Sequence, residues 1–122
     1  MSSNTIYIRV SRNQFRVRNV DSGADATTVA SIPFSTQRLL VGQFQAAVDA
    51  LKQALSQVVK SGFMAPSPQA VMHPLEMIDG GLCEIEDRTL RELAIGAGAA
   101  KAVVWLGHEL GDAEVKEKLR GK

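Results

Sequence analysis

Apolar and polar residues alternate along the first third of the chain. The two-residue period runs through residues 6–10 and 15–20, and a β-branched run follows at residues 27–32. This period is typical of strands that bury one face, and β-branched residues favour strands. Turn-forming residues at 11–14 and 21–25 separate the three runs. The pattern therefore predicts a three-stranded antiparallel meander.

The spacing of apolar residues changes to three and four in the next segment. The positions with this spacing are Val41, Phe44, Val48, Leu51, Leu55 and Val58. Because such spacing puts them on one face of a helix, we expect a long amphipathic helix over residues 39–60 that packs on the sheet. We expect Ser35 or Thr36 to cap its start and Gly62 to cap its end.

The second half of the chain alternates strand and helix patterns. Short apolar runs at residues 70–72 and 102–106 predict two buried strands. Between them, an acidic segment at 84–87 opens a helical pattern. The apolar residues of this pattern are Leu90, Leu93, Ala94 and Ala97. A strand, a helix and a second strand form a βαβ crossover, whose two strands are parallel. Residues 113–120 add a short, highly charged helix, with Asp112 as its cap, that we expect to fray.

Composition narrows the class of protein. The chain has 122 residues, 45% of them hydrophobic, and a net charge of +1, which fits one α/β domain over residues 1–122 and disfavours nucleic acid as a partner. Cys83 is the sole cysteine, so we expect no internal disulfide and a reducing compartment. We find neither a signal-peptide pattern nor an apolar run of membrane-spanning length. We therefore expect a cytoplasmic protein that makes no membrane contact.

Two segments resemble bacterial actins of the MreB type. Phe63-Met-Ala-Pro-Ser-Pro68 is similar to the loop before the fourth strand in that family, and segment 86–99, which ends in Gly-Ala-Gly-Ala, resembles its helix signature. The predicted order βββαβαβα is also that of the ribonuclease H-like fold, which actin-like ATPases contain twice. The resemblance implies that the chain corresponds to the first half (subdomain IA) of such a protein and lacks the second half.

The departures from this family bear on function. Actin-like ATPases open with an Asp-Leu-Gly-Thr-type turn that holds metal and phosphate, whereas this chain has Arg9-Val-Ser-Arg-Asn13 at the matching place. Since the carboxylate and the glycine are both missing, the comparison implies no ATPase activity, no cofactor and no metal. Glu86 matches the family's water-positioning carboxylate and is a weak catalytic candidate, because the helix dipole alone favours a glutamate at a helix start.

Other residues with useful chemistry form no defined motif. The first predicted hairpin carries four arginines: Arg9, Arg12, Arg16 and Arg18. They form either an anion- or nucleic-acid-binding patch, with only Tyr7 to stack on bases, or the solvated face of the sheet. His73, Cys83 and His108 do not have the spacing of a zinc site or of a nucleophile–base set.

Three functions remain open. The first is a non-catalytic, MreB-like module that binds a protein partner, linked by ancestry to the cytoskeleton or to cell shape, with a homodimer as a corollary. The second is a nucleotide-binding ATPase that completes its cleft by dimerisation. The third is an anion- or nucleic-acid-binding module that uses the arginine hairpin. We favour the first, because the fold signature is retained while the nucleotide turn is lost.

Overall fold

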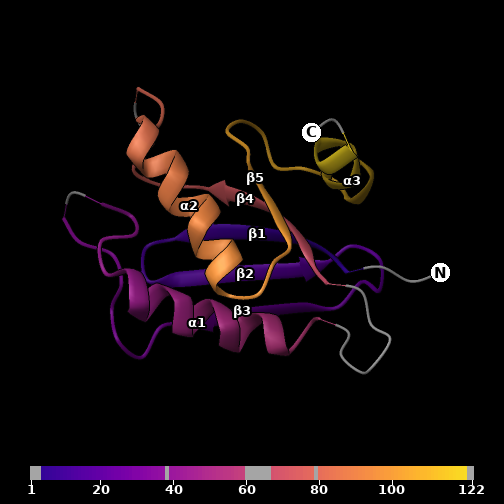
Figure 1. Ribbon diagram of the computed structural model, residues 1–122, viewed down its shortest axis with the longest axis horizontal. Coiled ribbons are helices and arrows are strands. Elements are labelled where there is room, and N and C mark those ends of the chain that lie inside the picture. The colour runs from indigo at the N-terminus through magenta and orange to yellow at the C-terminus, as the bar shows by residue number, and fades with distance from the viewer. Residues whose placement is uncertain (1–3, 38, 60–66, 79, 121–122) are drawn as a thin grey trace.

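A mixed sheet lies at the centre of the protein, with helices on both of its faces (Figure 1). The computed structural model describes residues 4–37, 39–59, 67–78 and 80–120. Helices α1 (Phe44–Ser56) and α2 (Glu84–Gly96) cover one face, and α3 (Asp112–Arg120) lies on the other. The predicted α/β class and the element order βββαβαβα are confirmed.

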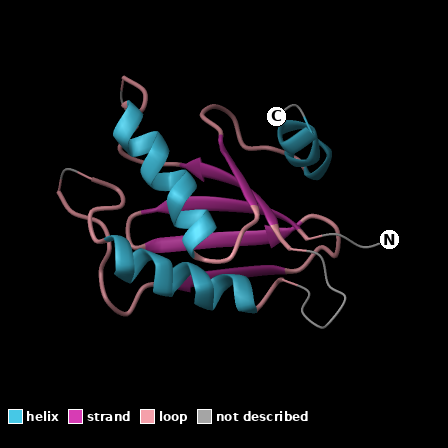
Figure 2. Ribbon diagram, in the orientation of Figure 1, coloured by secondary structure: helices cyan, strands magenta, loops and turns pink. Residues whose placement is uncertain are grey.

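The sheet combines the predicted meander with the predicted parallel pair (Figure 2). Its strands are β1 (Thr5–Ser11), β2 (Gln14–Asn19), β3 (Asp25–Val29), β4 (Gln69–Pro74) and β5 (Lys101–Val104). They lie in the order β3-β2-β1-β4-β5. β2 is antiparallel to both β1 and β3, and β4 is parallel to both β1 and β5. β1 is therefore the middle strand, and every one of its residues except Ser11 is buried.

The segment between β3 and α1 differs most from the prediction. β3 ends at Val29 rather than at residue 32, and α1 spans 44–56 rather than 39–60. Phe34 in the connecting loop stacks on Phe15 with ring centroids 4.8 Å apart, and its carbonyl accepts from the N–H groups of Gly42 and Gln43. Because Phe34 is anchored in this way, Leu40 is buried from a loop and not from a helix.

The expected helix caps are also wrong for α1. Ser35 Oγ donates to the Leu40 carbonyl, and Thr36 bonds to Leu39, so both hydroxyls hold the loop. Gln43 occupies the cap position and makes no side-chain cap bond. The predicted cap at Gly62 and segment 63–66 lie outside the described residues.

Two separate apolar cores hold the layers together. The larger core lies between the sheet and α1 and α2, and includes Ile8, Phe15, Leu51 and Leu93. The smaller core lies on the opposite face. It contains Tyr7, Val20, Val71, Val103, Leu110, Val115 and Leu119. The short α3 is therefore packed against the sheet through its two apolar residues, Val115 and Leu119, which are 0% and 4% exposed.

Candidate functional site

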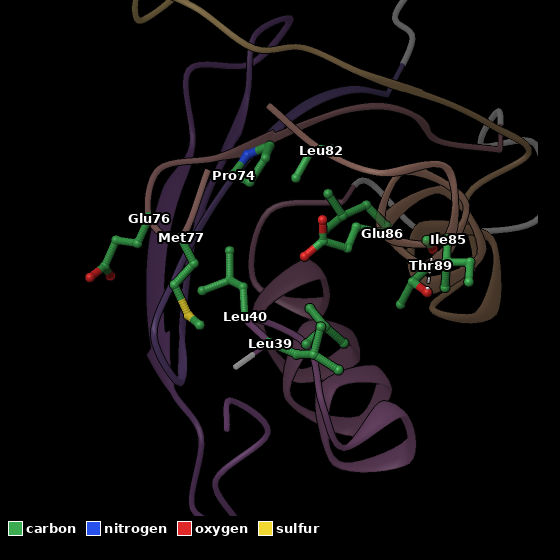
Figure 3. Close-up of a pocket in the computed structure, with 11 residues that line it drawn as sticks. Leu39, Leu40, Pro74, Glu76, Met77, Leu82, Ile85, Glu86 and Thr89 are labelled. Atoms are coloured by element: carbon green, nitrogen blue, oxygen red, sulfur yellow. Dashed lines mark hydrogen bonds between the residues drawn. The ribbon is translucent and has the colours of Figure 1, made fainter. Parts of the chain in front are cut away.

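An apolar groove opens where β4 ends and α2 begins (Figure 3). It is a small, open hollow with a cavity volume of about 60 Å³. Three segments line it: residues 39–41 of the loop before α1, the end of β4 with part of the loop that follows it, and the first turns of α2. The carboxyl ends of parallel strands are where open α/β sheets bind their ligands. The groove is therefore the candidate binding site.

The chemistry of the groove is mostly that of aliphatic side chains. Leu40 and Leu90 form a buried floor, whereas Leu39 and Ile85 at the rim are 42% and 76% exposed. Pro74, Val41, Met77 and Leu82 complete the apolar lining. Large aliphatic side chains left open to water beside a hollow are typical of a surface that another molecule covers.

Two carboxylates, Glu76 and Glu86, also line the groove. Glu86 Oε1 accepts from the backbone N–H of Cys83 at 3.0 Å, which is the contact that a capping glutamate makes at a helix start. Glu76 Oε2 accepts from the backbone N–H of Arg12 at 2.8 Å. The structure thus gives Glu86, the weak catalytic candidate, a capping role, and no cation lines the groove among the described residues.

The backbone N–H groups of the β1–β2 turn, where the MreB comparison would expect a phosphate-binding loop, bond to side chains of the protein itself. Besides the Arg12 N–H held by Glu76, the N–H of Asn13 donates to Ser35 Oγ at 3.0 Å. Asn13 adopts a φ of 55°, and its Oδ1 accepts from the N–H groups of Phe34 and Ser35. The backbone donors of this turn therefore already have partners within the chain.

The four candidate arginines do not form one open patch. Arg9, Arg16 and Arg18 share a face of the hairpin, as expected from their register. Arg9, however, is only 9% exposed, and it bonds to Glu109 at 2.9 Å and lies over the Tyr7 ring. The solvated face that the sequence suggested is thus partly covered.

Arg18 is also neutralised. It makes two bonds to the Asp112 carboxylate, at 2.8 and 3.0 Å, and a third to Asp25 at 2.7 Å. This contact holds the pKa of Asp112 below its ordinary value, chiefly through the Arg18 hydrogen bonds. Arg12 at the hairpin tip contacts Met77 Sδ at 3.2 Å, and Arg16 is exposed. Local sequence patterns did not indicate Glu109 and Asp112 as partners, because both come from the far end of the chain.

The other reactive side chains lie on different faces. Cys83 is exposed just before α2, whereas His73 is buried beneath the opposite face and bonds to Tyr7. His108 pairs with Glu114 at 3.1 Å. No nucleophile–base set is assembled among these three. Within the described residues no cluster of three metal-ligating side chains occurs, and no helix there is long and apolar enough to span a bilayer.

Tyr7 and His73 form a hydrogen-bonded pair that the sequence did not indicate. Tyr7 Oη lies 2.6 Å from His73 Nδ1 and accepts from the Leu110 N–H at 3.0 Å, while His73 Nε2 lies 3.1 Å from the Gly107 carbonyl. Burial raises the pKa of Tyr7, and burial lowers the pKa of His73. Both groups are therefore neutral over the physiological range of pH.

Comparison with known proteins gives one informative relative. No family model matches the chain, so the resemblance to MreB-type actins stays a prediction. The uncharacterized protein YjaA of Escherichia coli (strain K12) is 35% identical over 101 residues, which cover 79% of this chain and 78% of that protein. Identity at this level over most of both chains places them in one family: the protein belongs to the family of E. coli YjaA.

Proposed function

We propose that the protein is a non-catalytic interaction module that binds a protein partner through the apolar groove. The groove and its exposed rim carry this proposal. Ile85 and Leu39 stand open to solvent on either side of a hollow whose floor is apolar. Fully burying a side chain such as Ile85 is worth about 1.5–3 kcal/mol, so covering the rim residues would add to the affinity of a partner.

The fold and cellular context belong to the same proposal. The element order and the mixed sheet support a ribonuclease H-like domain of the MreB type, and that ancestry suggests a cytoplasmic partner connected with the cytoskeleton or cell shape. A second copy of the chain is an alternative occupant of the groove. Residues 86–99, which resemble the MreB helix signature, include most of α2, and the first turns of α2 line the groove.

The contacts near the groove weigh against the nucleotide-binding alternative. A phosphate at the β1–β2 turn needs free backbone N–H groups. Here Glu76 and Ser35 hold the N–H groups of Arg12 and Asn13. A nucleotide would have to displace the Glu76 carboxylate and then lie beside that charge, which repels phosphate.

The anion-binding alternative is weakened by charge pairing. Of the four hairpin arginines, Arg9 and Arg18 already bond to carboxylates within the chain. Two cations, Arg12 and Arg16, remain for an external polyanion. Because few counterions would be released, such binding would be weak and would depend only slightly on salt.

Photo-crosslinking tests the proposal directly. A photoreactive phenylalanine analogue is placed at Ile85 and, as a matched control, at Ile95, which lies on the same helix, is 49% exposed and does not line the groove. We expect a discrete crosslinked partner from position 85 only, and loss of that partner's copurification in Ile85→Asp but not in Ile95→Asp. Equal crosslinking from both positions, or full partner binding by Ile85→Asp, would contradict the proposal.

Sedimentation over a concentration range, with and without Mg-ATP, separates the alternatives. A monomer that ATP does not affect supports the interaction module. A dimer formed only with Mg-ATP would instead support the composite ATPase. A dimer formed without nucleotide, and dissociated by Ile85→Asp, would identify the groove as a self-association surface.

A further inference from the structure

We propose that residues 105–120 form a latch over the sheet, and that the latch is held closed only while His73 is neutral. The latch comprises the loop after β5 and helix α3, and it packs against β1, β4 and β5 on the face opposite α1 and α2. This inference does not depend on the proposed function of the groove.

The hydrogen bonds that close the latch allow a single arrangement of protons. The Leu110 N–H can only donate, so Tyr7 Oη accepts from it. The Gly107 carbonyl can only accept, so His73 Nε2 carries the proton that lies between them. In the neutral ring Nδ1 is then an acceptor, and the Tyr7 hydroxyl donates to it at 2.6 Å.

Protonation of His73 breaks this arrangement. With a proton on each ring nitrogen, Nδ1 becomes a donor and the Tyr7 O–H loses its acceptor. Tyr7 and His73 are each 2% exposed, so neither the unpaired hydroxyl nor the new positive charge reaches water while the latch is closed. Opening the latch hydrates both groups.

Some of the charged and titratable groups around His73 favour its protonation, and others oppose it. The groups that influence it are Arg9 on β1, and His108 and Glu109 in the latch; Glu114 on α3 influences its partner Tyr7. Arg9 and His108 oppose a proton on His73, whereas Glu109 favours one. Because Glu109 is itself bonded to Arg9 at 2.9 Å, its charge is largely matched before His73 titrates.

The remaining contacts of the latch are few enough for it to open separately from the domain. Leu110, Val115 and Leu119 supply its buried apolar residues. Two ion pairs on partly exposed side chains, Arg18–Asp112 and Lys116–Asp21, anchor α3, and such pairs add little each. Two further hydrogen bonds join the latch to the sheet: Lys101 Nζ donates to the Leu119 carbonyl, and the Trp105 backbone N–H donates to the Met72 carbonyl. Opening leaves the core between the sheet and α1 and α2 in place.

Hydrogen exchange across a range of pH tests the latch. Protection factors of amides at 107–119 are compared with those of β1 and β2 amides between about pH 7.5 and about pH 5, where most carboxylates stay ionised. His73→Gln is the key variant, since a Gln amide can accept from Tyr7 and donate to Gly107 at any pH. His108→Gln is the control for the second histidine of the latch.

We expect latch protection to fall by up to about tenfold per pH unit below the ordinary histidine pKa of about 6.5, while the strands remain protected. His108→Gln should behave like the wild type, and His73→Gln should remove the dependence. Tyr7→Phe, which removes the hydroxyl without changing packing, should lower latch protection by about tenfold at neutral pH. Trp105, the sole tryptophan, packs against the smaller core and gives a fluorescence readout of the same opening.

Three results would overturn the inference. The first is wild-type latch protection that does not change with pH. The second is an equal pH dependence in His73→Gln. The third is loss of strand and latch protection together, which would mean that acid unfolds the whole domain and that no separate latch exists.

Discussion

The side chain of Asn19 connects the end of β2 to the end of α1, and its replacement should be costly. Its Nδ2 donates to the Val58 carbonyl at 2.9 Å and to Asn4 Oδ1 at 3.1 Å. Its Oδ1 accepts from the N–H groups of Asp21 and Ser22 at 3.0 and 3.3 Å. Since a carbonyl can only accept and an N–H can only donate, the orientation of the amide is unambiguous.

Asn19→Asp keeps the shape of this side chain but replaces two donors with an acceptor. The Val58 carbonyl and Asn4 Oδ1 lose their donor, and a charged oxygen is placed beside them at a site that is 1% exposed. Losing a buried hydrogen bond in this way costs about 1–3 kcal/mol, so the loss of two such bonds predicts a decrease in stability of about 2–6 kcal/mol. This is a large part of the roughly 5–15 kcal/mol that stabilises a typical domain.

The pH dependence of this loss provides an independent check. Burial and two facing acceptors favour the protonated form, so the pKa of the introduced carboxyl is raised in the folded state. The folded variant therefore binds its proton at a higher pH than the unfolded chain does, and the penalty shrinks as pH falls through the folded pKa. The protonated carboxyl can again donate to the Val58 carbonyl.

Urea denaturation of the wild type and the variant, at neutral and mildly acidic pH, measures both effects. Gln45→Glu is the control, because it makes the same amide-to-acid change at an exposed helix position and should alter stability by less than about 0.5 kcal/mol. A loss of under about 1 kcal/mol for Asn19→Asp would refute the reasoning, as would a penalty that grows in acid.

Two further predictions concern α3. Leu119→Ala, which removes a side chain that is 4% exposed in the smaller core, should cost about 2–3 kcal/mol, near the lower end for Leu→Ala because α3 can relax; an unchanged urea midpoint would contradict it. The pKa of Asp112 is lowered because Arg18 bonds to its carboxylate, so the Arg18–Asp112 pair stabilises the fold above the ordinary pKa of 3.8. This stabilisation is lost as pH falls through the lower pKa of the folded state. Asp112→Asn should therefore flatten the fall in stability below about pH 4, and a slope as steep as that of the wild type in urea titrations would count against it.

Much of the fold follows from local patterns in the sequence. The alternation at residues 6–10 and 15–20 predicted β1 and β2, because one side of each strand faces the α1–α2 core. The helical spacing of Leu90, Leu93 and Ala94 predicted α2, since these residues are buried against the sheet. Local patterns succeed here because each element packs on a single layer.

The start of α1 could not be predicted in this way. Val41 has the spacing of a helical residue, but it lies with the buried Leu40 in a loop anchored at Phe34. That anchor depends on the contact between Phe34 and Phe15 and on the Asn13 amide, which accepts from the Phe34 N–H. These contacts join residues about 20 positions apart, and periodicity contains no information about them.

Local patterns also did not predict that the second face of the sheet is covered. Tyr7 and Arg9 alternate with apolar residues and suggested a solvated face, yet the latch buries both. Arg9 and Glu109 are 100 positions apart in the chain, so only the folded topology brings them together. One signal was present: the apolar run 70–72 puts Val71 on this face, and a strand that is apolar on both sides is covered on both sides.

The two faces of the sheet differ in the kind of contact that holds them, and this difference separates their roles. The α1–α2 face is held by contacts among aliphatic and aromatic side chains, which respond weakly to pH and salt. The latch is held by three buried apolar residues and the partly buried Trp105, together with ion pairs and the Tyr7–His73 hydrogen bonds. The ion pairs and these hydrogen bonds respond to salt and pH.

The groove and the latch nevertheless share one strand end. Pro74 lines the groove, and the preceding residue, His73, closes the latch from the opposite face of β4. A partner that shifts the backbone at 73–74 must also change the distances from His73 to Tyr7 and to Gly107, each of which is within hydrogen-bonding range in the closed state. Because coupling between two sites is reciprocal, such a partner would bind with different affinity to the open and closed latch, and its affinity would depend on pH. A partner that only covers Ile85 and Leu39 leaves this strand end unchanged, and its affinity should not vary with the protonation of His73.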